Sequence, residues 1–150
     1  MARFYEDYQI GEVLVHQPSR TVTESDNTLF CAITMNPQPL HLDYEFAKTT
    51  IHGKPLVNSI YTLGLILGLS VHDTTLGATL GNLGFGEIAF PKPVFIGDTL
   101  TAETTIRSKR LSKSRPGTGI VEFEHRARNQ NGVIVAHCVR TGMVMCRPQK

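Results

Sequence analysis

The side chains best suited to chemistry lie in one segment, Phe30 to Asn58. Within it, His41 stands in the run Met35 to Asp43, and histidine is the side chain that titrates near neutral pH. One interpretation makes His41 a general acid and base. The other makes it a histidine that braces a proline-rich turn, and the residue type alone does not decide between them.

Two amides precede this histidine, Asn36 and Gln38. An amide side chain cannot act as a general base at neutral pH, but it can orient a water molecule because it both donates and accepts hydrogen bonds. The alternative is structural, since Asn-Pro and Pro-Leu pairs are common in tight turns. Gln38 is the weaker candidate of the two.

A third group stands at Asn58 and Ser59, where a long apolar stretch begins. Both residue types are good helix N-caps. A helix start also presents free backbone N–H groups that bind negative charge. The structural and functional interpretations are therefore compatible here.

The front half of the chain has helical patterns. A first helix is predicted to begin near Thr23, which can cap it, with an apolar face made by Leu29, Phe30 and Ile33. Two prolines end it before Leu40. A short helix is predicted at 44–48, capped by Asp43. The stretch 57–71 is apolar almost all round and predicts a central, buried helix.

The back half has strand patterns. After an N-terminal segment, 5–22, with an early strand and a turn at Ile10-Gly11, alternation and β-branched residues predict strands at 99–106, 119–128 and 133–145. Asn131-Gly132 predicts a hairpin turn, and a longer polar loop is expected at 107–118. Together these patterns favour an α+β fold, with an antiparallel sheet packed on one helix.

Composition favours one globular domain over residues 1–150. Hydrophobic residues make up 41% of the chain, and the net charge of +2 gives no reason to expect nucleic acid. The three cysteines are widely spaced, which predicts free thiols in the cytoplasm and no metal site. The longest apolar run is too short to span a membrane, and the start of the chain does not look like a secretory signal.

Several segments, taken together, resemble the MaoC-like dehydratases, also called (R)-specific enoyl-CoA hydratases or the hydratase-2 family. The run Met35 to Asp43 falls without a gap on the family pattern G-D-x-N-P-x-H-x-D, and Leu56 to Ser59 falls on the start of its long helix. The segment 93–100 is similar to its P-V-x-x-G-D-T-L motif, and 129–132 to its N-Q-x-G turn. The resemblance covers nearly the whole chain in the right order.

This resemblance implies a hot-dog fold, a homodimer or higher homo-oligomer, an acyl-CoA substrate and no cofactor. It implies addition of water to an enoyl-CoA, or the reverse reaction, with His41 as acid and base. Asn36 would hold the water, and the Ser59 amide would take the thioester oxygen. The expected substrate-binding residues are Gln38, Asn58, Leu40 and Tyr61, and bulky Phe30, Tyr61 and Leu63 are candidates for limiting the acyl chain length.

The sequence also departs from the family pattern. The catalytic Asp of the family is Asn36 here, its Asn is Gln38, and its Gly is Met35. At the helix start, the family His is Asn58 and its Gly is Ser59. Another carboxylate is therefore a candidate for the missing acid, and Asp43, Glu24 and Glu87 are considered. This version of the motif also resembles a branch that acts on short branched or dicarboxylic acyl-CoAs, the mesaconyl-CoA hydratase type.

Two other functions remain open at this level. A hot-dog thioesterase generally has an acidic residue at the start of the central helix, and none stands at 57–59. A non-catalytic acyl-CoA-binding protein is the other alternative, because the family Asp is absent.

Other polar positions have mainly structural interpretations. The basic segment Arg107 to Arg115 is expected to be a solvated tip, with binding of CoA phosphates as the alternative. His52 to Pro55 is expected to be a connection, with a substrate-channel loop as the alternative, and His125 and His137 are expected to be structural or exposed.

Overall fold

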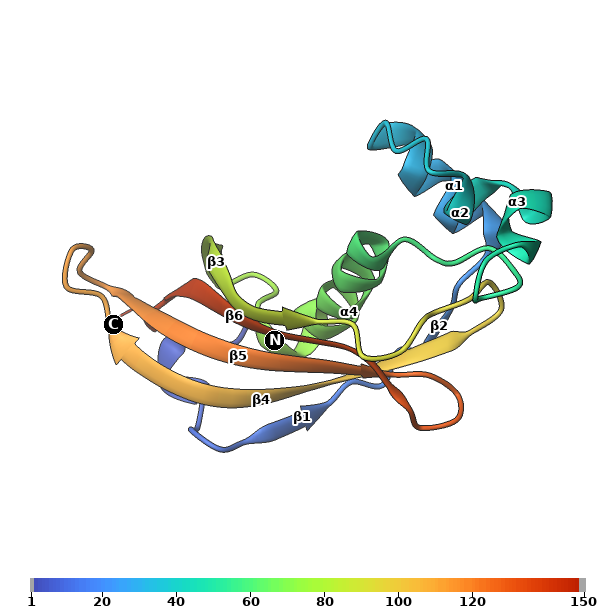
Figure 1. The fold of residues 1–150 in the computed structure, drawn as a ribbon. Coiled ribbons are helices and arrows are strands. Elements are labelled where there is room, and N and C mark those ends of the chain that lie inside the picture. The colour runs from blue at the N-terminus through green and yellow to red at the C-terminus, as the bar shows by residue number, and fades with distance from the viewer. Residues whose placement is uncertain (1, 149–150) are drawn as a thin grey trace.

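The computed structural model describes residues 2–148, which form one antiparallel sheet and one long helix (Figure 1). The elements in chain order are a 3-10 helix Tyr5–Asp7, β1 Val13–Val15, β2 Arg20–Thr21, α1 Glu24–Ile33, α2 Pro39–Leu42, α3 Tyr44–Lys48, α4 Ser59–Thr74, β3 Thr79–Ala89, β4 Thr99–Leu111, β5 Thr118–Arg128 and β6 Ile134–Met145. The predicted α+β class is confirmed.

The sheet has six strands in the order β1-β4-β5-β6-β3, and β2 pairs with β4. The hairpin expected at Asn131-Gly132 is present between β5 and β6, and Gly132 has the positive φ of 73° that such a turn requires. β4 is longer than predicted, because residues 107–111 continue the strand and 108–111 pair with 119–122. The expected long loop is therefore a short turn.

Among the strands whose bounds the sequence patterns did not predict is β3, at the end of the sheet beside β6. Its glycines weaken the strand pattern, and its pairing with β6 is interrupted by register shifts. Large apolar side chains on it remain exposed, namely Leu80, Leu83, Phe85 and Ile88. The outer side of β3 is thus an apolar edge, which pairs with no other strand among residues 2–148.

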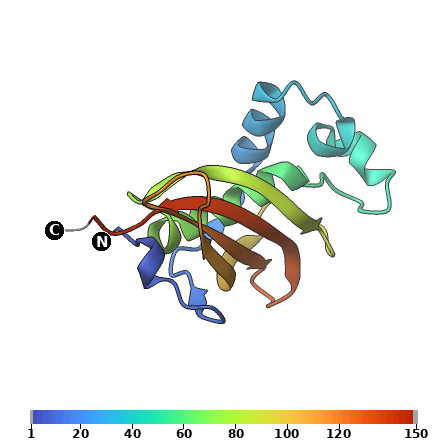
Figure 2. The ribbon, with the colours of Figure 1, turned by 90° about the vertical axis from the view of Figure 1, so that its left-hand side faces the viewer.

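The sheet curves around α4, whose buried face packs on β4, β5 and β6 (Figure 2). Leu63 and Ile66 of the helix meet Leu100 and Cys138 of the sheet in the main core. The predicted burial of α4 holds for most of the helix, whose exposed positions up to residue 71 are Ser59 and one open face with Ile60, 56% exposed, Gly64 and Gly68. Along residues 2–148 no helix is both long and apolar enough to cross a membrane.

Three short helices, α1 to α3, project from the start of α4 beyond the sheet (Figure 1). The predicted caps are present: the Thr23 hydroxyl accepts from the Asp26 N–H, and the Asp43 carboxylate accepts from the second and third amides of α3. The predicted apolar face of α1 was wrong. Leu29 and Ile33 are exposed, and the buried positions are Asn27 and Cys31.

A chain of polar side chains crosses the inner face of the sheet beneath the second half of α4. His16 Nδ1 lies 2.8 Å from the Asp73 carboxylate, and its Nε2 lies 2.7 Å from the Thr104 hydroxyl. Thr104 lies 2.8 Å from His125 Nδ1, and Arg140 Nε donates to His125 Nε2 at 3.2 Å. His125 is fully buried, so of the two locations expected for it, structural and exposed, it takes the structural one.

Burial and the nearby Arg140 and His16 lower the pKa of His125 from 6.5 to about 3. The unfolded chain therefore takes up a proton near pH 6.5 that the folded chain refuses until about pH 3, so stability is lost as the pH falls. Between pH 7 and pH 4.5 this histidine is expected to cost about 2.5 kcal/mol. Urea unfolding of wild type and His125→Gln checks this: the pH slope should be shallower in the variant, and equal slopes would contradict it.

Candidate active site

The turn that carries His41 is fastened to the start of α4 by one buried side chain, Asn27 of α1. Its amide nitrogen donates to the His41 carbonyl at 3.0 Å and to the Leu56 carbonyl at 3.5 Å. Its amide oxygen accepts from the Asn58 N–H at 2.9 Å. Asn27 is 1% exposed, so its loss would leave buried polar groups without partners. It fixes the position of His41 relative to α4.

The imidazole of His41 is oriented by a backbone carbonyl. Nδ1 lies 2.7 Å from the Leu56 carbonyl oxygen. A carbonyl can only accept, so Nδ1 carries the hydrogen and Nε2 keeps its lone pair. The ring is half-buried in α2. Its Nε2 is therefore available as a base.

The first turn of α4 is capped by Asn58, whose side-chain oxygen accepts from the Ile60 N–H at 2.9 Å. This cap leaves the Ser59 N–H, the first of the helix, without a protein acceptor within residues 2–148. The helix begins later than predicted because the Val57 N–H pairs with the Val94 carbonyl. Ser59 thus presents a free backbone donor at the positive end of α4.

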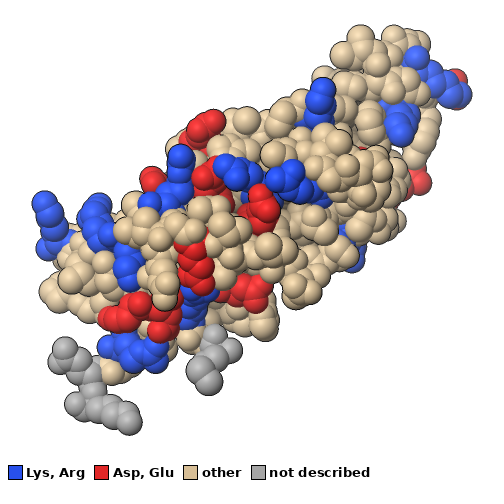
Figure 3. Space-filling model, turned by 90° about the horizontal axis from the view of Figure 1, so that it is seen from below, with Lys and Arg blue, Asp and Glu red and all other residues tan. Residues whose placement is uncertain are grey.

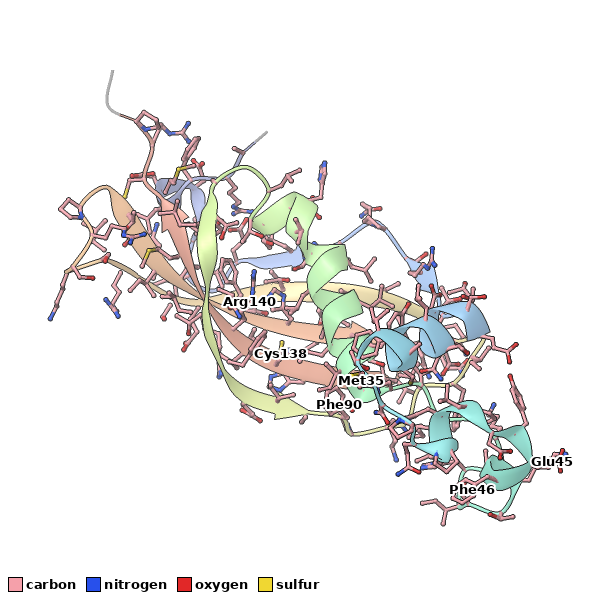
Figure 4. The ribbon with its side chains drawn as sticks, turned by 90° about the horizontal axis from the view of Figure 1, so that it is seen from above. Met35, Glu45, Phe46, Phe90, Cys138 and Arg140 are labelled. Atoms are coloured by element: carbon pink, nitrogen blue, oxygen red, sulfur yellow. The ribbon has the colours of Figure 1, made fainter. Side chains whose placement is uncertain are left out.

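Ser59 lines a cavity of about 210 Å³ at this end of the helix, here named the α4 cavity. Its walls are His52, Leu56, Val57, Ser59, Thr62, Phe90, Pro91, Lys92, Pro93, Val94 and Val135. Figure 4 shows Phe90 beside the end of α4 from which the helix begins. His41 does not itself border this cavity, but its imidazole is held by the carbonyl of Leu56, which does.

Asn36 lies in the turn that follows α1. Its side-chain oxygen accepts from the Gln38 N–H at 3.0 Å, which is the turn-forming role, and Met35 before it has a positive φ of 55°. Its amide nitrogen remains as a donor. Asn36 lines a second and more open cavity of about 530 Å³, with Cys31 and Met35, instead of the α4 cavity. Asn36 and Ser59 therefore border two separate cavities.

The remaining predicted binding residues border neither the α4 cavity nor the cavity at Asn36. The Leu40 carbonyl accepts a hydrogen bond from the Leu56 N–H. Gln38 is the N-cap of α2, and it is exposed. Tyr61 packs edge to face on Phe30, with ring centroids 5.7 Å apart, and borders neither cavity. Leu63 is buried in the core.

The carboxylates considered as substitutes for the family Asp lie elsewhere. Asp43 caps α3, and Glu24 is exposed in the first turn of α1. The Glu87 side chain is 68% exposed and lies 3.9 Å from half-buried His137. None of the three borders the α4 cavity or the cavity at Asn36.

The basic segment Arg107 to Arg115 lies at the β4–β5 hairpin, at the opposite end of the molecule from α1 to α3 (Figure 1). Lys and Arg side chains gather at that end among acidic ones (Figure 3). Arg107 pairs with Glu124, and Lys109 donates to the Tyr5 carbonyl. This placement favours a solvated tip over a contact with CoA bound at His41 in the same chain.

Sequence patterns missed Asn27 and the basic residues of the α4 cavity. Asn27 is four residues before Cys31, so the two share a face of α1, but a polar residue at such a position gives no sign of what it will contact. For His52 a connection was favoured over a substrate-channel loop, and the structure places it on the cavity wall with Lys92, which fits the second interpretation better.

Comparison with known proteins agrees with the fold. The family described as MaoC like domain matches residues 7–128, and the chain belongs to that family. A solved protein from Mycobacterium tuberculosis with a double hotdog fold superposes with a TM-score of 0.89 at 20% identity, over 99% of this chain and 46% of that one. The chain therefore has the hot-dog fold.

Two curated relatives carry activities in their names. Mesaconyl-CoA hydratase from Cereibacter sphaeroides is 36% identical over 97% of this chain and 42% of its own length. (R)-specific enoyl-CoA hydratase from Rhodospirillum rubrum is 29% identical over 69% of each chain. This chain thus spans about two fifths of the length of the mesaconyl-CoA hydratase.

Proposed function

We propose that this chain is a hydro-lyase that adds water to the double bond of a trans-2-enoyl-CoA, or removes it from the 3-hydroxyacyl product. The observation that carries the proposal is the Nδ1–H bond from His41 to the Leu56 carbonyl. It leaves Nε2 as a base beside a helix start whose Ser59 N–H is free. Base and oxyanion donor are the two groups that this reaction needs.

In the forward direction, His41 Nε2 takes a proton from the attacking water as its oxygen bonds to the β-carbon. The electron pair of the double bond moves toward the thioester oxygen, where the Ser59 N–H stabilises the enolate charge. His41 then returns the proton to the α-carbon, so that one water has been added. We assign Asn36 the role of holding the water oxygen through its amide hydrogens, since its own oxygen accepts from the Gln38 N–H. This role requires the water to reach Asn36 from outside the α4 cavity, which Asn36 does not border.

The substrate that we propose is a short branched or dicarboxylic acyl-CoA of the mesaconyl-CoA type. The name of the Cereibacter relative supports this choice, and so does the small volume of the α4 cavity, about 210 Å³. Assay of crotonyl-CoA and mesaconyl-CoA tests the reaction, with mass spectrometry to detect the gain of one water. Release of free CoA instead would indicate a thioesterase, and no change in either substrate would favour a binding protein.

We propose that two copies associate through β3 and continue the sheet from edge to edge. The strand ends the sheet, carries exposed apolar side chains such as Leu83 and Phe85, and would otherwise remain open to aggregation. The open face of α4 at Ile60 adds apolar surface. Light scattering that gives the mass of a single chain would contradict this association.

We also propose a cytoplasmic location. The three cysteines Cys31, Cys138 and Cys146 are free thiols, which suits a reducing compartment. Cell fractionation tests the location, and recovery outside the cytoplasm would contradict it.

A further inference from the structure

Two basic side chains on the wall of the α4 cavity have no acidic partner among residues 2–148. Lys92 and His52 both line the cavity, and no Asp or Glu among residues 2–148 does. Neither Lys92 nor His52 forms an ion pair with any of residues 2–148. The His52 ring packs edge to face on Phe95 at 6.1 Å, which orients it without using its nitrogens.

The remainder of the wall is mostly apolar. The apolar lining residues are Phe90, Pro91, Pro93, Val94, Leu56, Val57 and Val135, and of these Phe90, Pro91 and Pro93 are exposed at its rim. A volume of about 210 Å³ corresponds to about seven water molecules in the liquid, which suits a short acyl group. An apolar pocket with one convergent charged group is the usual form of a site that selects a small ligand by one polar end.

We infer that the α4 cavity selects acyl groups that end in a carboxylate, and that Lys92 binds this carboxylate with help from His52. The inference rests on the proposed function, because the thioester is placed at the Ser59 N–H. An ammonium group provides charge-assisted hydrogen bonds to a carboxylate, and a methyl group in the same place makes none. Lys92 is then a specificity-determining residue, and the reaction itself does not require it.

Binding of saturated analogues tests this inference separately from turnover. Methylsuccinyl-CoA and 2-methylbutanoyl-CoA differ by a carboxylate in place of a methyl group, and neither can be hydrated. Calorimetric titration of the wild-type chain is expected to give about tenfold tighter binding of methylsuccinyl-CoA. In Lys92→Met this preference should disappear, while binding of 2-methylbutanoyl-CoA stays within about twofold.

Lys54→Met is the matched control. Lys54 lies nearby, with its ammonium 4.2 Å from the centre of the Phe95 ring, but it does not line the cavity. This variant should keep the wild-type preference. A wild-type chain without preference would overturn the inference, and so would a preference that persists in Lys92→Met. Equal weakening of both analogues in Lys92→Met would also overturn it, since that result assigns Lys92 to the CoA phosphates that both share.

Discussion

Replacement of His41 by alanine is expected to lower kcat for enoyl-CoA hydration by about 10³-fold, because proton transfer through a positioned side chain contributes on that order. The variant loses the only group at the turn that we propose to exchange a proton with water and the α-carbon. Binding of a saturated acyl-CoA should change little, since the Ser59 N–H and the α4 cavity remain. Steady-state kinetics and calorimetry measure the two effects.

His41→Asn separates chemistry from support of the turn. An asparagine amide at this position can still donate to the Leu56 carbonyl, which the native ring does at 2.7 Å, but it cannot take a proton. We expect this variant to be as inactive as His41→Ala and more stable in thermal unfolding. If His41→Asn keeps most of the wild-type activity, the histidine is structural and the proposed base is wrong.

The second large effect is expected from Ser59→Pro. Proline lacks the backbone N–H, and the first position of a helix is where it is best tolerated. The preceding Asn58 already has φ of −59° and ψ of 127°, which is compatible with a following proline. Removal of one oxyanion donor should therefore lower kcat by about 10²- to 10³-fold without unfolding the helix.

Ser59→Ala is the control, because it removes the hydroxyl and keeps the amide. It should retain activity within about threefold, and both variants should melt close to the wild-type temperature. Equal activity of Ser59→Pro and Ser59→Ala would show that the backbone N–H does not stabilise the enolate.

Local chemistry explains which parts of the structure could be predicted. Thr23, Asp43 and Asn58 are caps in the structure because a short polar side chain bonds to amides a few residues away, and that depends on neighbouring sequence alone. The turn at Asn131-Gly132 is local in the same way. The strands β4 to β6 alternate because one face is buried, so their pattern is visible in the sequence.

The features that were missed depend on distant contacts. β3 is a strand because β6 provides its hydrogen bonds, although its own glycines disfavour one. Asn27 is buried because it bridges His41, Leu56 and Asn58, which lie far along the chain. Lys92 and His52 likewise come to line the same cavity because the chain before β4 crosses the start of α4.

For the central claim, that this chain is a hydratase although Asn36 replaces the family's Asp, the most direct measurement is steady-state hydration of crotonyl-CoA and mesaconyl-CoA by wild type and Asn36→Asp side by side. We expect the wild-type chain to turn over at least one of these substrates, with His41 as its base, and Asn36→Asp to keep or increase that rate. Activity that is absent from the wild type and present only in Asn36→Asp would mean that the fold has been kept for binding, and the proposed function would be wrong.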